Sequence, residues 1–130
     1  MTPLVLVIDD DPVTLELIEL VLQQHRYRTY GHVDHVTAYE LMRELHPDLV
    51  ITDLMYGACI MGCNTLMLAS LDPQTRDIPV LLMSSNTDYL RKNRQYLRER
   101  GCDTLEKPFS LEQLLAKVIA AIGESTDVVA

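Results

Sequence analysis

The sequence predicts an α/β fold, in which a doubly wound five-stranded parallel sheet carries helices on both faces. Short apolar runs alternate along the chain with longer segments of helical periodicity. Within the apolar runs, polar and apolar residues do not alternate, as in strands that are buried on both faces. A chain in which strands and helices take turns is typical of a parallel sheet covered on both sides.

Five apolar runs are the predicted strands, and each is short. They are Leu4–Ile8, Tyr27–Tyr30, Leu49–Ile51 with Asp53 at its end, Pro79–Met83 and Thr104–Leu105. Gly31 is expected to close the second strand. The segment Met55–Asn64 has two glycines and little periodicity, so we interpret it as a loop.

Five segments are the predicted helices, and most have recognisable ends. They are Pro12–Gln24, Ala38–Leu45, Leu66–Leu71, Thr87–Arg100 and a last helix from Ser110 to Ile122. Proline suits the first turn of a helix, and Asp11 directly before it is expected to be the N-cap. Ser110 is the expected N-cap of the last helix, and Gly123 its end.

Length and composition narrow the class of protein. The 130 residues fit one compact domain over residues 1–123, followed by a flexible C-terminal tail over residues 124–130. No apolar run approaches the roughly 20 residues that cross a membrane, and there is no signal-peptide pattern. The three cysteines do not indicate a disulfide framework, which favours a cytoplasmic protein. The net charge of −8 argues against direct binding of nucleic acid.

The most informative motif is the acidic string Asp9-Asp10-Asp11, which directly follows the first predicted strand. Neighbouring carboxylates disfavour one another's ionisation, so acids crowded at a strand end call for a cation between them. A hard divalent cation such as Mg²⁺ is the natural candidate, because it prefers oxygen ligands and takes few of them from the protein.

Further polar residues end the other predicted strands. Asp53 follows the third strand, Ser84 the fourth, and Glu106, Lys107 and Pro108 the fifth. In open parallel sheets, ligands bind at the carboxyl ends of the strands. Any one of these residues is explained by the general polarity of strand ends. The whole set in this order favours a functional site.

With these residues the chain resembles the receiver domain of bacterial two-component response regulators. The resemblance rests on Asp9-Asp10, Asp53, Ser84 after Pro79–Met83, and Lys107-Pro108-Phe109, and it covers about residues 3 to 122. It implies a flavodoxin-like (βα)5 fold with strand order 2-1-3-4-5, and a receiver domain over residues 1–123.

The resemblance also implies a metal site. Asp10 and Asp53 would bind Mg²⁺ directly, and Asp9 mostly through water. The backbone carbonyl of Met55, two residues after Asp53, would complete the protein ligands.

The same resemblance implies a phosphoryl-accepting switch rather than an enzyme in the usual sense. Asp53 would accept the phosphoryl group from a histidine kinase or a histidine phosphotransfer protein. Ser84 would hydrogen-bond a phosphoryl oxygen, and Lys107 would pair with the phosphoryl oxygens. Such a domain catalyses at most its own phosphorylation and dephosphorylation, and this chemistry consists mainly of positioning and charge neutralisation.

Two departures from the family pattern leave an alternative open. Three residues before Lys107 the family has Tyr or Phe as a read-out, and here the residue is Thr104. The run Asp53-Leu54-Met55-Tyr56-Gly57 lacks the usual Met-Pro pair. We expect the output to pass through Tyr89 or a shift of the fourth helix. The alternative is a receiver-like interaction module that acts without phosphorylation.

The surface from the fourth helix to the last helix is the expected output face, with a second copy of the chain or a downstream protein as its partner. Arg91, Arg94 and Arg98 share one side of a helix by their spacing, either as a solvated face or as a docking face.

A zinc site is disfavoured, because Cys59, Cys63, His32 and His35 match no standard spacing. A phosphatase of related fold is also disfavoured, since it would need an acid in place of Met55.

Overall fold

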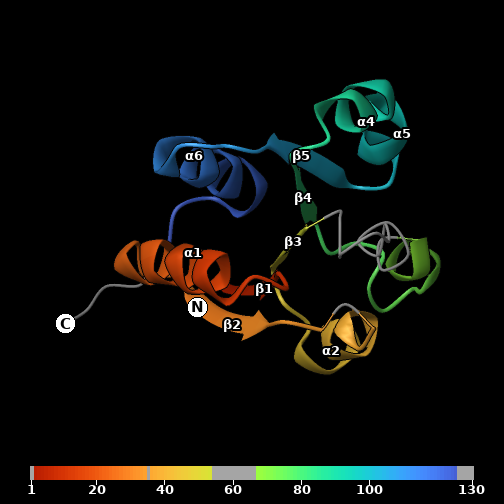
Figure 1. Cartoon of the computed structure of the whole chain (residues 1–130). Coiled ribbons are helices and arrows are strands. Elements are labelled where there is room, and N and C mark those ends of the chain that lie inside the picture. Colours follow the sequence, from red (N-terminus) through yellow and green to blue (C-terminus); the bar gives the residue numbers. More distant parts are fainter. Residues whose placement is uncertain (1, 35, 54–66, 126–130) are drawn as a thin grey trace.

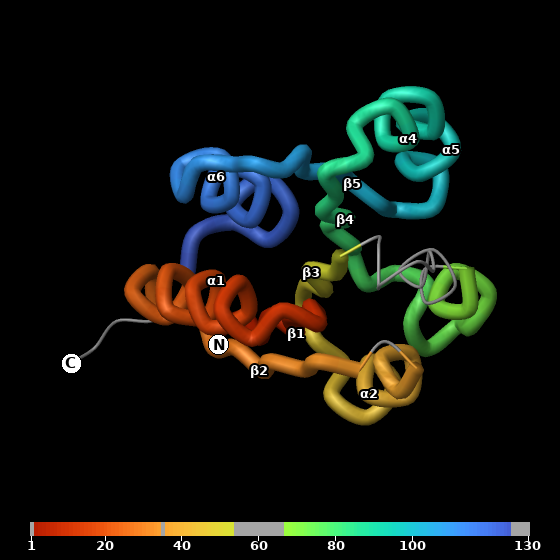
Figure 2. Tube along the Cα trace, in the orientation of Figure 1, coloured from red at the N-terminus to blue at the C-terminus, as the bar shows by residue number. Residues whose placement is uncertain are grey.

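The computed structural model describes residues 2–34, 36–53 and 67–125. Its five strands form one parallel sheet in the order β2-β1-β3-β4-β5. The strands are β1 Leu4–Ile8, β2 Arg28–His32, β3 Leu49–Asp53, β4 Val80–Ser84 and β5 Cys102–Glu106. The predicted fold class and strand order are confirmed, and β1 and β3 lie side by side at the centre of the sheet (Figure 2).

Helices cover both faces of this sheet (Figure 1). They are α1 Pro12–Gln24, α2 Ala38–Leu45, α4 Thr87–Lys92, α5 Arg94–Glu99 and α6 Leu111–Ile122, and residues 67–71 are also helical. One core cluster joins alternate strand residues such as Val7 and Ile51 to α1 and α6. The other joins Ile8 and Leu82 to α2, α4 and α5.

The expected N-caps of the first and last helices are confirmed. Asp11 accepts hydrogen bonds from Val13 N–H at 3.1 Å and from the Thr14 hydroxyl at 2.9 Å. Ser110 and Gln113 form a reciprocal capping box at the start of α6. These caps fix where α1 and α6 begin, and both starting points flank the carboxyl edge of the sheet.

One predicted helix is wrong in its extent, because the segment 87–100 forms two helices that are separated at Asn93. The Asn93 side chain donates to the carbonyl oxygen of Tyr89 at 2.9 Å, and its own N–H donates to the same oxygen at 3.1 Å. Asparagine side chains form such local hydrogen bonds to the backbone, which makes asparagine unfavourable inside a helix.

Two strands are also longer than predicted. β2 continues through Gly31 to His32 as it pairs with β1, and β5 runs from Cys102 to Glu106 as it pairs with β4. Both strands lie at the edges of the sheet. Backbone pairing with a single neighbouring strand extends each of them beyond the residues that the weak sequence pattern predicts.

After α6, the Ser125 hydroxyl donates to the carbonyl oxygen of Arg26 at 2.6 Å. The rest of the predicted tail lies outside the described residues.

Candidate functional site

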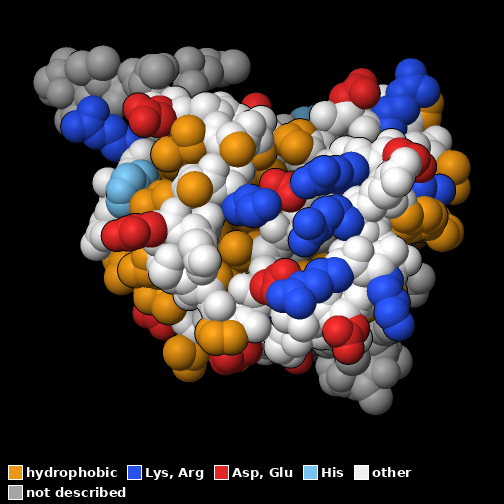
Figure 3. Space-filling model, turned by 90° about the horizontal axis from the view of Figure 1, so that it is seen from above, with side chains coloured by type: hydrophobic (Ala, Val, Ile, Leu, Met, Phe, Trp, Pro, Cys, Tyr) orange, Lys and Arg blue, Asp and Glu red, His pale blue; other side chains and the backbone are white. Residues whose placement is uncertain are grey.

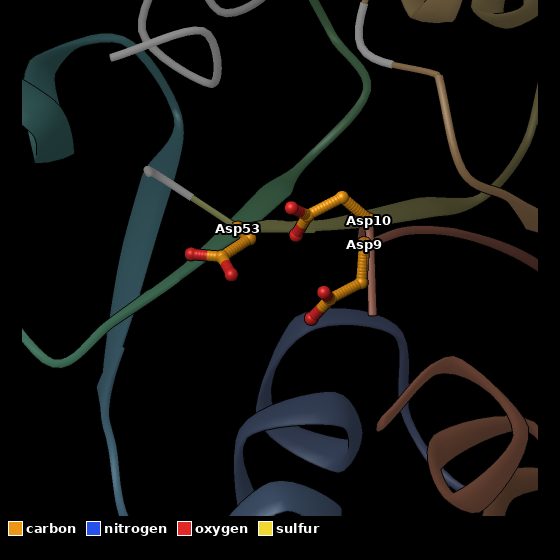
Figure 4. Close-up of side chains that lie close together, drawn as sticks. All are labelled: Asp9, Asp10 and Asp53. Atoms are coloured by element: carbon orange, nitrogen blue, oxygen red, sulfur yellow. The ribbon is translucent and has the colours of Figure 1, made fainter. Parts of the chain in front are cut away.

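Three carboxylates meet where β1 and β3 end (Figure 4). Asp9 is fully buried, Asp10 is exposed, and Asp53, the last residue of β3, is 8 % exposed. One oxygen from each carboxylate lies within 4.8 Å of the other two. The sequence leads to this arrangement because two parallel neighbours, β1 and β3, end at the same edge.

Lys107 reaches the same carboxylates from the end of β5. Its Nζ lies 2.9 Å from Asp53 Oδ2 and 3.5 Å from Asp9 Oδ2. Its backbone N–H donates to the carbonyl oxygen of Ser84 at 2.8 Å, which holds this residue against the end of β4. The peptide bond between Lys107 and Pro108 is cis.

Burial shields these charged groups from water, and their charges shift one another's pKa. Burial raises the pKa of the Asp9 carboxyl above its ordinary value, although the backbone N–H of Asp11 and the ammonium of Lys107 oppose the rise. Burial alone would lower the pKa of Lys107. The hydrogen bond and charge of Asp53, together with the charge of Asp9, outweigh this effect, and the pKa of Lys107 is raised. The ammonium is therefore charged at neutral pH.

The donor set fits a hard divalent cation. Three carboxylates offer oxygen atoms close together, and Asp9 is also fixed by the Asp11 N–H, which donates to Asp9 Oδ1 at 2.9 Å. Mg²⁺ is usually held by one or two protein carboxylates and completes its shell with water. Met55, whose carbonyl we expect among the ligands, lies outside the described residues.

Ser84 is buried at the end of β4, where its hydroxyl belongs to a local hydrogen-bond chain. Its Oγ accepts from the backbone N–H of Asn86 at 2.9 Å. The Asn86 side chain in turn caps α4 by accepting from Tyr89 N–H at 3.2 Å. The candidate phosphoryl-binding hydroxyl is thus linked to the first turn of α4.

One contact near the site was not foreseen from the sequence. Arg91 on α4 donates to both oxygens of Glu106, at 2.9 Å from Nη2 and 3.3 Å from Nε. Glu106 directly precedes Lys107, so this pair ties α4 to the strand end beside the site. The sequence does show an acidic residue next to the strand-end lysine and a basic helix before it. Which basic residue pairs with Glu106 depends, however, on how α4 packs against the sheet.

Known proteins resemble this chain in sequence and in fold. Residues 5–119 match the family model of the response regulator receiver domain. The chain belongs to this family. The receiver domain is 32 % identical over 120 residues to the DNA-binding dual master transcriptional regulator RpaA of Synechocystis sp., a match that covers 92 % of this chain and 49 % of that protein. It is 33 % identical over 118 residues to hybrid signal transduction histidine kinase D of Dictyostelium discoideum, covering 90 % of this chain and 7 % of the relative.

The receiver domain spans about half the length of RpaA. Solved structures share its fold. Chemotaxis response regulator CheY4 of Vibrio cholerae superposes with a TM-score of 0.81 at 21 % identity, covering 93 % of this chain and 99 % of that one. The receiver domain of sensor histidine kinase PA1611 from Pseudomonas aeruginosa gives 0.79 at 22 % identity, covering 95 % and 100 %, and is described with a magnesium ion in its active site cleft.

In the described ranges, no helix has both the length and the apolar character that a membrane crossing requires.

Proposed function

We propose that this receiver domain accepts a phosphoryl group on Asp53 from a histidine kinase or a histidine phosphotransfer protein. The observation that carries the proposal is the position of Lys107 Nζ, 2.9 Å from Asp53 Oδ2 and 3.5 Å from Asp9 Oδ2. A carboxylate repels an anionic phosphoryl donor unless positive charge stands beside it. Lys107 supplies such a charge at the acceptor itself.

In the proposed reaction, an oxygen of Asp53 attacks the phosphorus atom of a phosphohistidine. The new O–P bond forms as the P–N bond breaks, and the electron pair of that bond returns to the histidine nitrogen, which takes up a proton. Lys107 orients and neutralises the phosphoryl oxygens during this transfer. The product is an acyl phosphate, a reactive anhydride that suits a reversible signal.

Asp9, Asp10 and Asp53 would hold Mg²⁺ in this domain. The proximity of their oxygens, within 4.8 Å of one another, supports this part of the proposal, as does the buried position of Asp9. When bound, the ion would neutralise charge on the phosphoryl oxygens. Asp9 and its hydrogen bond from Asp11 N–H would keep the other ligands in place.

Ser84 and α4 would report that the site is filled. Ser84 Oγ is engaged with Asn86 N–H, and Asn86 caps α4 through Tyr89 N–H. If the Ser84 side chain rotated to donate its hydroxyl hydrogen to a phosphoryl oxygen, its Oγ would move away from Asn86 N–H and disturb this chain of contacts. The route does not require a ring at position 104. It leads to the surface formed by α4, β5 and α6, and regulation there would make the domain a switch.

Incubation with acetyl phosphate and Mg²⁺ tests the acceptor. Intact mass should rise by one phosphoryl group, and Asp53→Asn should remove the increase. Asp77→Asn, an exposed aspartate near the start of β4, is the matched control and should be labelled like the wild type. A protein that stays unmodified both by acetyl phosphate and by a phosphorylated histidine phosphotransfer protein would instead be a receiver-like module that acts without phosphorylation.

A further inference from the structure

Two hydrogen bonds join the end of α6 to the turn between α1 and β2. The Tyr27 hydroxyl donates to the carbonyl oxygen of Gly123 at 2.6 Å, and the Ser125 hydroxyl donates to the carbonyl oxygen of Arg26 at 2.6 Å. Figure 1 shows the end of α6 beside α1. The contacts lie where β2 begins, at the opposite edge of the sheet from the carboxylate cluster. They take no part in the proposed phosphoryl chemistry.

Both sides of this contact have an unusual backbone conformation. Arg26 has a φ of 67°, in the left-handed region that residues with a side chain rarely adopt. Gly123 has a φ of 75° and a ψ of 172°, a combination that is open essentially to glycine alone. Among the described residues, no atom lies within 4 Å of a Cβ built at position 123, so the backbone conformation and not the space calls for glycine. Gly123 is thus suited to be a hinge between α6 and the residues that follow.

The packing between α6 and this turn is incomplete. A hollow of about 330 Å³ is lined by the α1–β2 turn, by α6, and by residues 124 and 125. Leu115 and Ile119 of α6 line its apolar part, and Ile119 is 38 % exposed. Figure 3, which views the molecule from the side of α6, shows hydrophobic side chains at this surface. The attachment of residues 123–125 therefore depends strongly on the two hydrogen bonds.

We propose that residues 123–125 form a latch, which closes α6 onto the turn between α1 and β2 and opens as a local unit while the rest of the domain stays folded. Opening would turn the latch about Gly123 and break both hydrogen bonds together. It would uncover the Tyr27 hydroxyl and widen the hollow. The latch thus decides whether the chain directly after α6 is fixed beside α1 or free to move. It needs no phosphorylation of Asp53 and goes beyond the proposed function.

Opening of the latch would leave the core intact. The ring of Tyr27 is 4 % exposed and belongs to the core cluster that contains Leu22 and Val118. Residues 123 and 124 are exposed and Ser125 is half-buried, so their release would bring little apolar surface into water. Local opening has a low free energy where few buried apolar contacts hold a segment. Opening of the latch should therefore be much more frequent than unfolding of the domain.

Hydrogen exchange of the whole, unphosphorylated chain tests the latch, with mass spectrometry of peptides that cover residues 22–28 and 119–125. Tyr27→Phe and Ser125→Ala each remove one hydrogen bond and keep most of the side-chain packing. Each should speed exchange in both segments by about fivefold, the usual net effect of one lost hydrogen bond. The double variant should multiply the two effects. Exchange in β3, Leu49–Asp53, should stay unchanged, because a local opening leaves the centre of the sheet paired.

Gly123→Ala tests the hinge without removing either hydroxyl group. Alanine fits the space but not the backbone conformation, so the closed latch is disfavoured and exchange in residues 22–28 should rise by at least about fivefold. Gly101→Ala is the matched control. Gly101 has a φ of 72°, and among the described residues no atom lies within 4 Å of its built Cβ either. It lies directly before β5, away from the latch, so its substitution should leave exchange in residues 22–28 unchanged.

The hydroxyl deletions have controls of the same kind. Tyr39→Phe removes a hydroxyl group that donates to Asp72, and Ser70→Ala removes one that donates to the carbonyl oxygen of Met67. Both hydrogen bonds lie outside the latch. Neither control should change exchange in residues 22–28 or 119–125.

Three results would overturn the proposal. Unchanged exchange in the double variant would show that the two hydrogen bonds do not hold the latch. An equal increase in β3 would show that they act only through the global stability of the fold. A response in one of the two segments alone would show that the segments do not open together. Labelling of Asp53 by acetyl phosphate is measured separately in each variant, so a failure of the phospho-acceptor function remains distinguishable from a failure of the latch.

Discussion

Lys107 places its ammonium nitrogen 2.9 Å from Asp53 Oδ2, although 54 positions separate the two residues in the chain. Their meeting depends on β3 and β5, which both end at the carboxyl edge with β4 between them. The same nitrogen lies 3.5 Å from Asp9 Oδ2, so one cation serves two buried carboxylates. This contact makes Lys107 the first residue to test.

Lys107→Met should slow phosphorylation of Asp53 by acetyl phosphate by about 10²-fold, the usual cost of losing one charge-stabilising donor. The physical reason is that the Asp53 carboxylate would face the anionic donor with less positive charge beside it. The rate is measured by intact mass against time at saturating Mg²⁺. Lys117→Met removes another half-buried lysine, which pairs with Asp103 away from the site, and should leave the rate unchanged. Equal rates in the wild type and Lys107→Met would exclude this role for Lys107.

The strand ends of the site could be predicted from the sequence because the sheet is simple. The three inner strands, β1, β3 and β4, read as continuous apolar runs, and these runs end visibly at Asp9, Asp53 and Ser84. The break at Asn93 could not be predicted in this way. It depends on one side chain donating to the Tyr89 carbonyl rather than on hydrophobic periodicity, and periodicity continues across both helices through Leu90 and Leu97.

The ion pair between Arg91 and Glu106 could not be predicted from the sequence pattern either. The two residues lie 15 positions apart on different elements. Their distance is set by how α4 packs on the sheet through Leu90.

Asp10→Asn should weaken Mg²⁺ binding by more than about tenfold, which corresponds to 1.4 kcal/mol. Asp10 is the exposed member of the carboxylate cluster, and an amide oxygen is a poorer ligand for a hard cation than a carboxylate. Affinity is measured by isothermal titration calorimetry. Asp11→Asn removes a neighbouring charge while keeping a good N-cap for α1, so it is the matched control. If both variants lost affinity equally, Asp10 would act through general charge rather than as a ligand.

Asp72 should make the stability of the fold depend on pH. Its carboxylate accepts from the Tyr39 hydroxyl at 2.5 Å and from Gln74 N–H at 2.9 Å, and Arg43 lies at 3.2 Å. The hydrogen bond from Tyr39, then that from Gln74, lower the pKa of Asp72 below its usual 3.8. Because the folded state binds this proton less readily than the unfolded chain, the stabilisation is present above the unfolded pKa. It is lost as pH falls through the lower folded pKa.

Asp72→Asn should therefore lower the thermal unfolding midpoint most near neutral pH. The difference from the wild type should shrink as the pH drops below about 4. Midpoints are followed by circular dichroism across this range. Asp77→Asn, an exposed aspartate five residues further along, should leave the midpoint unchanged at every pH. A difference between the wild type and Asp72→Asn that stays constant across the range would show that the ionisation of Asp72 does not stabilise the fold.

Filling the proposed phosphoryl site should loosen the first turn of α4. Ser84 Oγ accepts from Asn86 N–H at 2.9 Å, and Asn86 Oδ1 accepts from Tyr89 N–H at 3.2 Å. If the Ser84 hydroxyl turns toward a phosphoryl oxygen, Asn86 N–H loses its acceptor and the cap of α4 weakens. Loss of an N-cap costs a helix about 1 kcal/mol, so α4 should open more often.

Hydrogen exchange of α4 amides measures this response directly. Addition of Mg²⁺ and beryllium fluoride, a phosphoryl mimic, should speed exchange at Thr87–Lys92 by about fivefold, the equivalent of about 1 kcal/mol in opening free energy. Ser84→Ala should show the faster exchange before the mimic is added and change little afterwards. The amides of α2, Ala38–Leu45, lie outside this chain of contacts and should not change in either protein. Unchanged exchange rates of the α4 amides in the wild type with the mimic bound would contradict the proposed route from Ser84 to Tyr89. The route has no other step that connects the site to α4.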